Sequence, residues 1–85
     1  MRKRLSKLEL NILEQINYYY NNKGYPPSYK ELGLKVFVVP GTIGYYLTKL
    51  RKEGYLTFDD HVARSVRLTG KALVILKWRD KNLGL

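Results

Sequence analysis

Residues 40–58 of the chain read PGTIGYYLTKLRKEGYLTF. Early in this stretch the apolar side chains recur at spacings of three and four, which predicts a helix over residues 42–52 with one buried face: Ile43, Leu47 and Leu50. Gly54 is a typical residue at a helix end. After it the apolar spacing falls to two, which indicates a strand. The stretch therefore predicts a helix followed directly by a strand, and the rest of the fold is predicted around this pair.

Two more helices are predicted before this stretch, because the capping-box pattern occurs twice. Ser6 with Glu9 marks the start of a helix that extends to residue 22. Ser28 with Glu31 marks the start of a shorter helix over residues 29–35. These two helices and the third would together form the body of the domain.

The segment VFVVPG at residues 36–41 is predicted to be the turn of a helix-turn-helix. Its β-branched residues would also suit a strand, but it is short and lies between two helical patterns. It ends in Pro40-Gly41, a turn-forming pair. Gly33, just before it, disfavours the second helix by about 1 kcal/mol relative to alanine.

Downstream, strands are predicted at residues 55–58 and 64–68 with a loop between them, and Ser65 and Arg67 are expected to point outward. Thr69 can cap a last helix over residues 71–81. The sequence therefore predicts an α+β, mostly helical fold: a winged helix-turn-helix with a three-helix core, a two-stranded β wing and an extra C-terminal helix.

The chain divides into three predicted parts. Residues 1–4 form a flexible basic arm, and residues 5–69 form the winged helix-turn-helix domain. Residues 70–85 form the C-terminal helix, which is apolar on more than one face and is a possible dimerisation element.

The charge of the chain points to its partner. Sixteen Lys and Arg against seven Asp and Glu give a net charge of +9, so we expect binding to a polyanion, most commonly nucleic acid. Cysteine is absent and His61 is the single histidine, so we predict no metal and no cofactor. With no signal peptide and no long apolar run, we expect no membrane partner and a cytoplasmic, nucleoid-associated protein.

The polar face of the third helix is the predicted base-reading surface, because the major groove is wide enough to admit an α-helix. This face carries small, hydroxylated and basic side chains and no acidic one. The residues expected to face bases are Gly41, Thr42, Gly44, Tyr45 and Thr48. An ordinary solvated helix face is the alternative interpretation.

Phosphate contacts are predicted from the basic arm, from the start of the second helix, where backbone N–H groups favour an anion, and from the third helix. The residues are Arg2, Lys3, Arg4, Ser28, Tyr29, Lys30, Lys49, Arg51 and Lys52. In the wing, His61 and Arg64 are predicted to touch the minor groove or phosphates. Asp59 and Asp60 oppose this because they would repel phosphate, and they can instead hold the turn.

Three segments resemble the N-terminal DNA-binding domain of LexA-type repressors: GYPPSYKEL (24–32), GTIGYYLTKLRKEGYL (41–56) and ARSVRL (63–68). The family usually has a glycine in the turn after the second helix, where this chain has Val36-Phe37-Val38-Val39, and its turn is often one residue longer. The resemblance implies a DNA-binding repressor. The family's self-cleaving domain, with its Ser–Lys dyad, is not part of this sequence, which could be a domain excerpt or a free-standing small regulator. In either case we expect no self-cleavage.

We therefore expect a sequence-specific double-stranded DNA-binding protein, a transcriptional repressor that reads the major groove with helix 42–52 and acts as a homodimer through its C-terminal helix. The alternatives are a winged-helix protein-interaction or assembly module and non-specific nucleic-acid binding in replication. We do not expect an enzyme, because one histidine, no cysteine and no Gly-rich phosphate loop leave no acid–base site.

Overall fold

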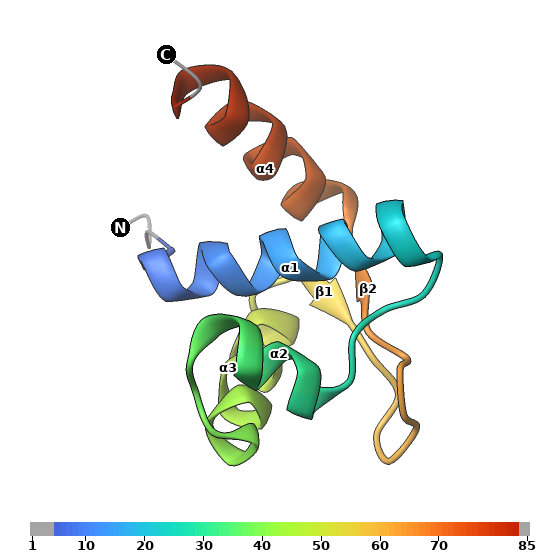
Figure 1. The fold of residues 1–85 in the computed structure, drawn as a ribbon. Helices are drawn as coiled ribbons and strands as arrows, with labels where there is room; N and C mark the ends of the chain where they lie inside the picture. Colours follow the sequence, from blue (N-terminus) through green and yellow to red (C-terminus); the bar gives the residue numbers. More distant parts are fainter. Residues whose placement is uncertain (1–4, 84–85) are drawn as a thin grey trace.

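The computed structural model describes residues 5–83, which form a helical body with a small two-stranded sheet at one side (Figure 1). In chain order the elements are α1 (Lys7–Lys23), α2 (Tyr29–Val36), α3 (Pro40–Lys52), β1 (Leu56–Thr57), β2 (Arg67–Leu68) and α4 (Gly70–Leu83). This order confirms the predicted winged helix-turn-helix with an extra C-terminal helix. The predicted basic arm, residues 1–4, lies outside the described residues.

Both predicted capping boxes are present, at the starts of α1 and α2. The N–H of Ser6 donates to Oε1 of Glu9 at 2.8 Å, and the N–H of Glu9 donates to Oγ of Ser6 at 3.1 Å. Ser28 and Glu31 make the same two hydrogen bonds at the same distances. These reciprocal bonds satisfy backbone donors that have no partner inside the helix, so they fix where each helix begins.

α3 begins two residues earlier than predicted. Pro40 and Gly41, which the sequence analysis assigns to the turn, form the first turn of α3, and Val39 is its N-cap. Proline fits the first position of a helix because its missing N–H would have no partner there. The turn is therefore short, and its first residue, Phe37, adopts a left-handed conformation with φ +62°.

Gly33 makes this tight turn possible. A Cβ at residue 33 would overlap the carbonyl oxygen of Val38, well inside the 3.0 Å that real Cβ contacts respect. The N–H of Val38 in turn donates to the carbonyl of Gly33 at 2.9 Å. The glycine that disfavours α2 by propensity is thus required by the close approach of the turn.

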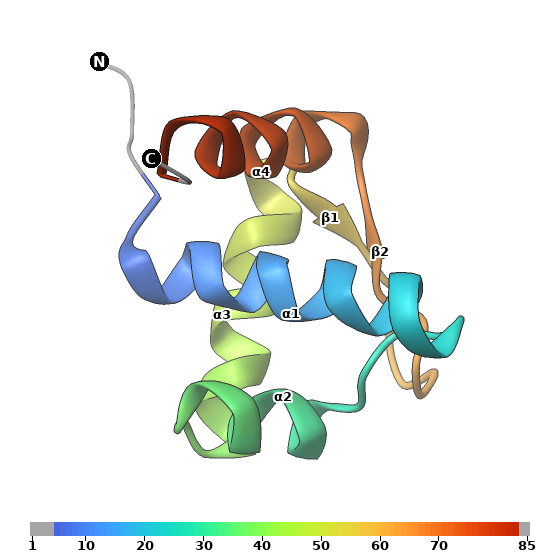
Figure 2. The same cartoon turned by 45° about the horizontal axis from the view of Figure 1, so that its top comes forward.

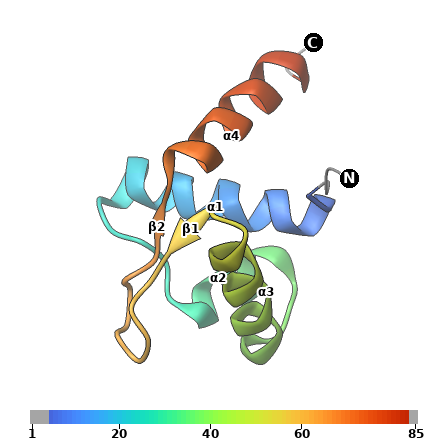
Figure 3. The same ribbon diagram turned by 180° about the vertical axis from the view of Figure 1, so that it is seen from behind.

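The core lies where α1, α2 and α3 meet each other and the sheet. Its fully buried side chains include Ile12, Leu13, Ile16, Leu32, Ile43, Leu47, Leu50 and Leu56. α1 lies between α2 and α4 and contacts both (Figure 2). α3 and the wing loop project on one side of the molecule, while α4 lies on the opposite side (Figures 1 and 3).

The wing strands are shorter than predicted, so the bounds 55–58 and 64–68 were wrong. β1 and β2 pair antiparallel through two residue pairs only: Leu56 with Leu68 and Thr57 with Arg67. Two residues of the loop, His61 and Arg64, have φ of +63° and +55°, which interrupts the extended backbone that a longer ladder needs.

Side-chain hydrogen bonds hold the wing loop together. Oγ of Ser65 accepts the N–H of Asp59 at 3.0 Å and donates to the carbonyl of Val62 at 2.9 Å. Ser65 is half-buried and faces the loop, so the prediction that it points outward was wrong. Arg67 is exposed, as predicted.

α4 begins one residue before the predicted start. The hydroxyl of Thr69 donates to the carbonyl of Gly54 at 2.7 Å and accepts the N–H of Ala72 at 3.5 Å, so it joins the start of α4 to the end of α3. Over residues 5–83, no helix has both the length and the apolar character that crossing a bilayer requires.

Candidate nucleic-acid interface

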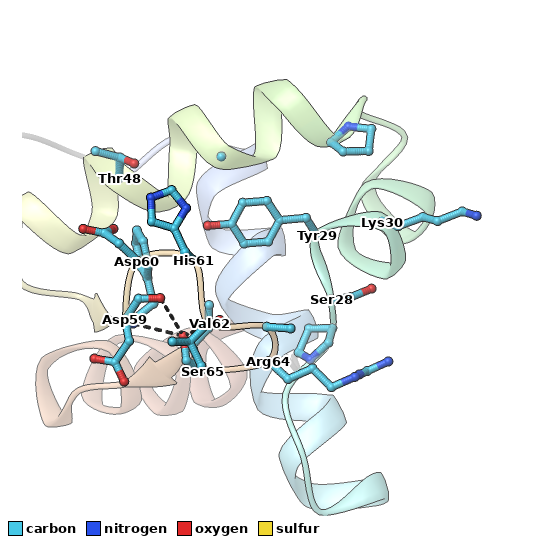
Figure 4. A pocket seen from close by; sticks show the side chains of 16 residues that line it. Ser28, Tyr29, Lys30, Thr48, Asp59, Asp60, His61, Val62, Arg64 and Ser65 are labelled. Carbon is cyan, nitrogen blue, oxygen red and sulfur yellow. Dashed lines mark hydrogen bonds between the residues drawn. The ribbon is translucent and has the colours of Figure 1, made fainter.

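A cleft of about 740 Å³ separates the wing from α2 and α3 (Figure 4). The fold thereby brings three segments that are distant in sequence to one surface. The predicted site residues that line the cleft are Ser28, Tyr29, Lys30, Gly44, Thr48, His61 and Arg64. Within residues 5–83, no three His, Asp or Glu side chains gather closely enough to hold a metal ion.

The outward face of α3 is open to solvent. Gly41, Thr42, Tyr45 and Thr48 are all exposed, and the side chain of Tyr45 keeps 64% of its accessible surface. The Tyr45 ring lies edge-on to the ring of half-buried Tyr46, with 5.2 Å between the ring centres. This contact favours one orientation of the most exposed aromatic side chain on α3.

Gly44 is the exception among the predicted base-facing residues, because Tyr29 covers it. A Cβ at residue 44 would meet a ring carbon of Tyr29 at 3.5 Å. In Figure 4 the hydroxyl of Tyr29 points across the cleft toward His61. Burial raises the pKa of Tyr29, so its hydroxyl stays protonated and can donate a hydrogen bond. The surface here is formed by Tyr29 rather than by Gly44.

Three of the cations predicted to contact DNA have acidic partners inside the domain. The pairs are Lys49 with Glu9 at 2.9 Å, Arg51 with Asp60 at 3.1 Å, and Arg64 with Glu31 at 2.8 Å. Lys30 and Lys52 are exposed. Arg2, Lys3 and Arg4 lie outside the described residues. Phosphate contact by each of these cations stays a prediction.

Glu9 explains why Lys49 is held against the body of the domain. The Glu9 side chain is only 2% exposed. Burial raises the pKa of Glu9, but the hydrogen bonds from the Ser6 backbone and from Lys49 outweigh it and lower the pKa below its ordinary value. Glu9 is therefore ionised at neutral pH, and its pair with Lys49 joins α3 to the start of α1.

The wing residues His61 and Arg64 point in different directions. His61 points into the cleft toward α3, whereas the Arg64 side chain runs toward the start of α2 (Figure 4). There Arg64 donates to the carbonyl of Pro26 at 2.9 Å and to Glu31. Its hydrogen bond to Glu31 lowers the pKa of that carboxyl to about 2.

Glu31 and Asp60 were not predicted from the sequence to belong to this surface. Glu31 was predicted only as a helix cap, and Asp60 as a source of repulsion or a residue that holds the turn, but neither was predicted to pair with an arginine. Their arginine partners lie 33 and 9 residues away along the chain. No local pattern signals such pairs, because they depend on where the wing folds back.

The short α2, the exposed α3 and the hairpin beside them define a winged helix-turn-helix domain. The family model of the LexA DNA binding domain matches residues 2–65, and the chain belongs to this family. The predicted resemblance is thus confirmed.

Several curated relatives of this family are LexA repressors. The one from Pediococcus pentosaceus is 32% identical over 83 residues, which cover 96% of this chain and 40% of the relative. The one from Caldicellulosiruptor saccharolyticus is 36% identical over 72 residues, and that from Bacillus thuringiensis is 32% identical over 69. Each of these two matches covers 80% of this chain and 34% of the relative, so the chain spans well under half the length of its relatives.

Proposed function

We propose that this domain binds a specific sequence of double-stranded DNA and represses transcription. The observation that carries the proposal is the outward face of α3, where exposed Thr42, Tyr45 and Thr48 stand on a helix that has no acidic residue. α3 itself projects on the same side of the molecule as the wing loop (Figures 1 and 3). Membership of the LexA DNA-binding family and the net charge of +9 support the same function.

In the proposed complex α3 enters the major groove. The hydroxyls of Thr42 and Thr48 can donate to or accept from base edges, and their methyl groups can meet a thymine methyl. Tyr45 adds a large exposed ring beside them. Lys30, Lys52 and the basic arm would contact phosphates, which supply affinity but no sequence information.

Selection of duplexes from a random pool, followed by titration at several salt concentrations, tests the proposal. We expect log K to fall linearly with log[salt], with a slope of roughly −0.9 per neutralised phosphate. Tyr45→Ala is expected to weaken binding to the selected duplex by about tenfold and to leave random duplexes nearly unaffected. Lys77→Ala on α4, away from this surface, is the control.

Other results would contradict the proposal. Equal affinity for selected and random duplexes would favour non-specific nucleic-acid binding, as in replication. No binding to duplex DNA at low salt, together with a co-purifying protein, would favour a protein-interaction or assembly module.

We also infer that the protein acts as a homodimer through α4. The side chains of Leu73, Val74 and Trp78 keep 46%, 68% and 65% of their accessible surface. This helix lies opposite the wing loop, so a partner bound there would leave α3 free (Figure 1). Sedimentation with and without a two-site duplex tests this: Val74→Lys should yield monomers, whereas Leu34→Lys, at an equally exposed apolar residue of α2, should not.

Two further inferences accompany the proposed function. We infer that the domain is not itself an enzyme, because its single histidine has neither a cysteine nor a second histidine to act with. We also place the protein in the cytoplasm in association with the nucleoid, where its DNA partner lies. Incubation of the purified chain alone, with mass measurement over time, tests for self-cleavage.

A further inference from the structure

Two arginines connect the wing to the helices beside it. Nη1 of Arg51, on α3, donates to the carbonyl of Phe58 at 3.1 Å and to Oδ1 of Asp60 at 3.1 Å. Its guanidinium also lies 3.9 Å from the centre of the Phe58 ring. Arg51 thus holds the first part of the wing loop against α3.

Arg64 holds the other part of the loop. Nη1 of Arg64 donates to the carbonyl of Pro26 at 2.9 Å and to Oε1 of Glu31 at 2.8 Å, and the guanidinium lies 4.9 Å from the centre of the Tyr25 ring. Because the sheet itself has only two residue pairs, the position of the loop depends heavily on these side chains. The two arginines anchor it to α3 and to the start of α2.

We propose that Glu31 and Asp60 are positioning residues that promote DNA binding despite their negative charge, because they hold the arginines that place the wing. This inference rests on the proposed function. A carboxylate near a phosphate-binding surface normally weakens binding by repulsion. Here each carboxylate orients an arginine that sets the width of the cleft between α3 and the wing. With the pairs, the wing loop is already ordered before DNA binds. Without them, the loop would have to be ordered on binding, and the lost conformational entropy would weaken the affinity.

Two isosteric substitutions remove the negative charge from each pair and little else, so the arginine keeps at most a weaker, neutral hydrogen bond. In Glu31→Gln the remaining amide oxygen can still accept the N–H of Ser28, so the capping box persists. Asp60→Asn changes an exposed side chain. Each raises the net charge of +9 by one, so simple electrostatics predicts tighter DNA binding.

Two control variants make the same change in net charge. Asp59 is next to Asp60 in the wing, and within residues 5–83 its carboxylate takes part in no ion pair, so Asp59→Asn leaves both anchors intact. Glu14 pairs with Arg79 of α4 at 3.2 Å, remote from the wing loop. Glu14→Gln therefore removes an ion pair without changing any residue of the proposed DNA-binding surface.

The assay is titration of a selected duplex with each variant at several salt concentrations. Glu31→Gln and Asp60→Asn are expected to weaken affinity by about three- to tenfold each, and the two controls to leave it unchanged or tighter. The slope of log K against log[salt] should stay as in the unchanged protein, since no phosphate contact is lost. Tighter binding with a steeper slope in Glu31→Gln and Asp60→Asn would overturn the inference, because the freed arginines would then be contacting phosphate.

Amide hydrogen exchange of the free protein gives a second readout that needs no DNA. Residues 59–65 should exchange faster in Glu31→Gln and Asp60→Asn than in the controls. Faster exchange with unchanged DNA affinity would overturn the positioning role alone. Failure of the unchanged protein to bind any duplex would overturn the proposed function, and this inference with it.

Discussion

Gly33→Ala offers a direct test of how α2 leads into α3. The added Cβ would overlap the carbonyl oxygen of Val38, and the two atoms must separate to at least 3.0 Å. That oxygen is backbone, and the adjoining N–H of Val38 is bonded to the carbonyl of Gly33 at 2.9 Å. The separation therefore requires movement of the turn itself rather than rotation of a side chain.

The change in the free energy of unfolding is the sum of two destabilising effects and one stabilising effect. Overpacking of this kind costs about 1–3 kcal/mol, and weakening of the Val38 hydrogen bond adds about 1 kcal/mol. Replacing glycine by alanine within a helix returns about 1 kcal/mol. We expect a net loss of about 2 kcal/mol, a large part of the roughly 4–13 kcal/mol that stabilises a domain of this length.

Urea unfolding followed by circular dichroism measures the loss. With a slope of about 1 kcal/mol/M, the midpoint should fall by about 2 M. Gly41→Ala is the matched control, since a Cβ there meets nothing within 4 Å and its midpoint should not fall. A midpoint for Gly33→Ala at or above that of the unchanged protein would refute the steric argument.

Three further predictions concern single residues. Phe37 is 93% exposed with φ +62°, so Phe37→Gly should raise the free energy of unfolding by about 1 kcal/mol, and an unchanged urea midpoint would contradict this. The folded-state pKa of Glu31 is about 2, below its ordinary 4.5, so its contribution to the free energy of unfolding is complete above pH 4.5 and lost toward pH 2. Glu31→Gln should therefore make the free energy of unfolding fall less steeply on the acid side, as measured by urea titration at each pH. Lys49→Met leaves Glu9 buried without its partner, so unfolding should become easier by about 1–3 kcal/mol and the pKa of Glu9, followed by NMR, should rise.

The sequence is most informative where the controlling contacts are local. Both capping boxes join residues three apart, so the starts of α1 and α2 are predictable. The start of α3 was predicted too late because Pro-Gly is typical of a turn, whereas proline is equally suited to the first position of a helix, where Pro40 lies.

The site was predictable at the level of elements but not of individual side chains. The apolar spacing of three and four correctly indicates that α3 exposes Tyr45 and Thr48. The partners of Arg51 and Arg64 could not be predicted, since both arginines look from sequence like free cations beside the DNA. An arginine's partner is set by tertiary folding, which charge patterning along the chain does not encode.

The two-pair sheet of the wing has a consequence for how such domains can diversify. Within residues 5–83, only Leu56, Thr57, Arg67 and Leu68 take part in the ladder, so residues can be inserted at the loop tip without shifting a strand register. The helix proposed to face the bases, α3, is built from a separate part of the chain. If α3 reads the bases as proposed, grafting at the loop would lengthen or shorten its reach along a duplex and leave the base preference of α3 intact.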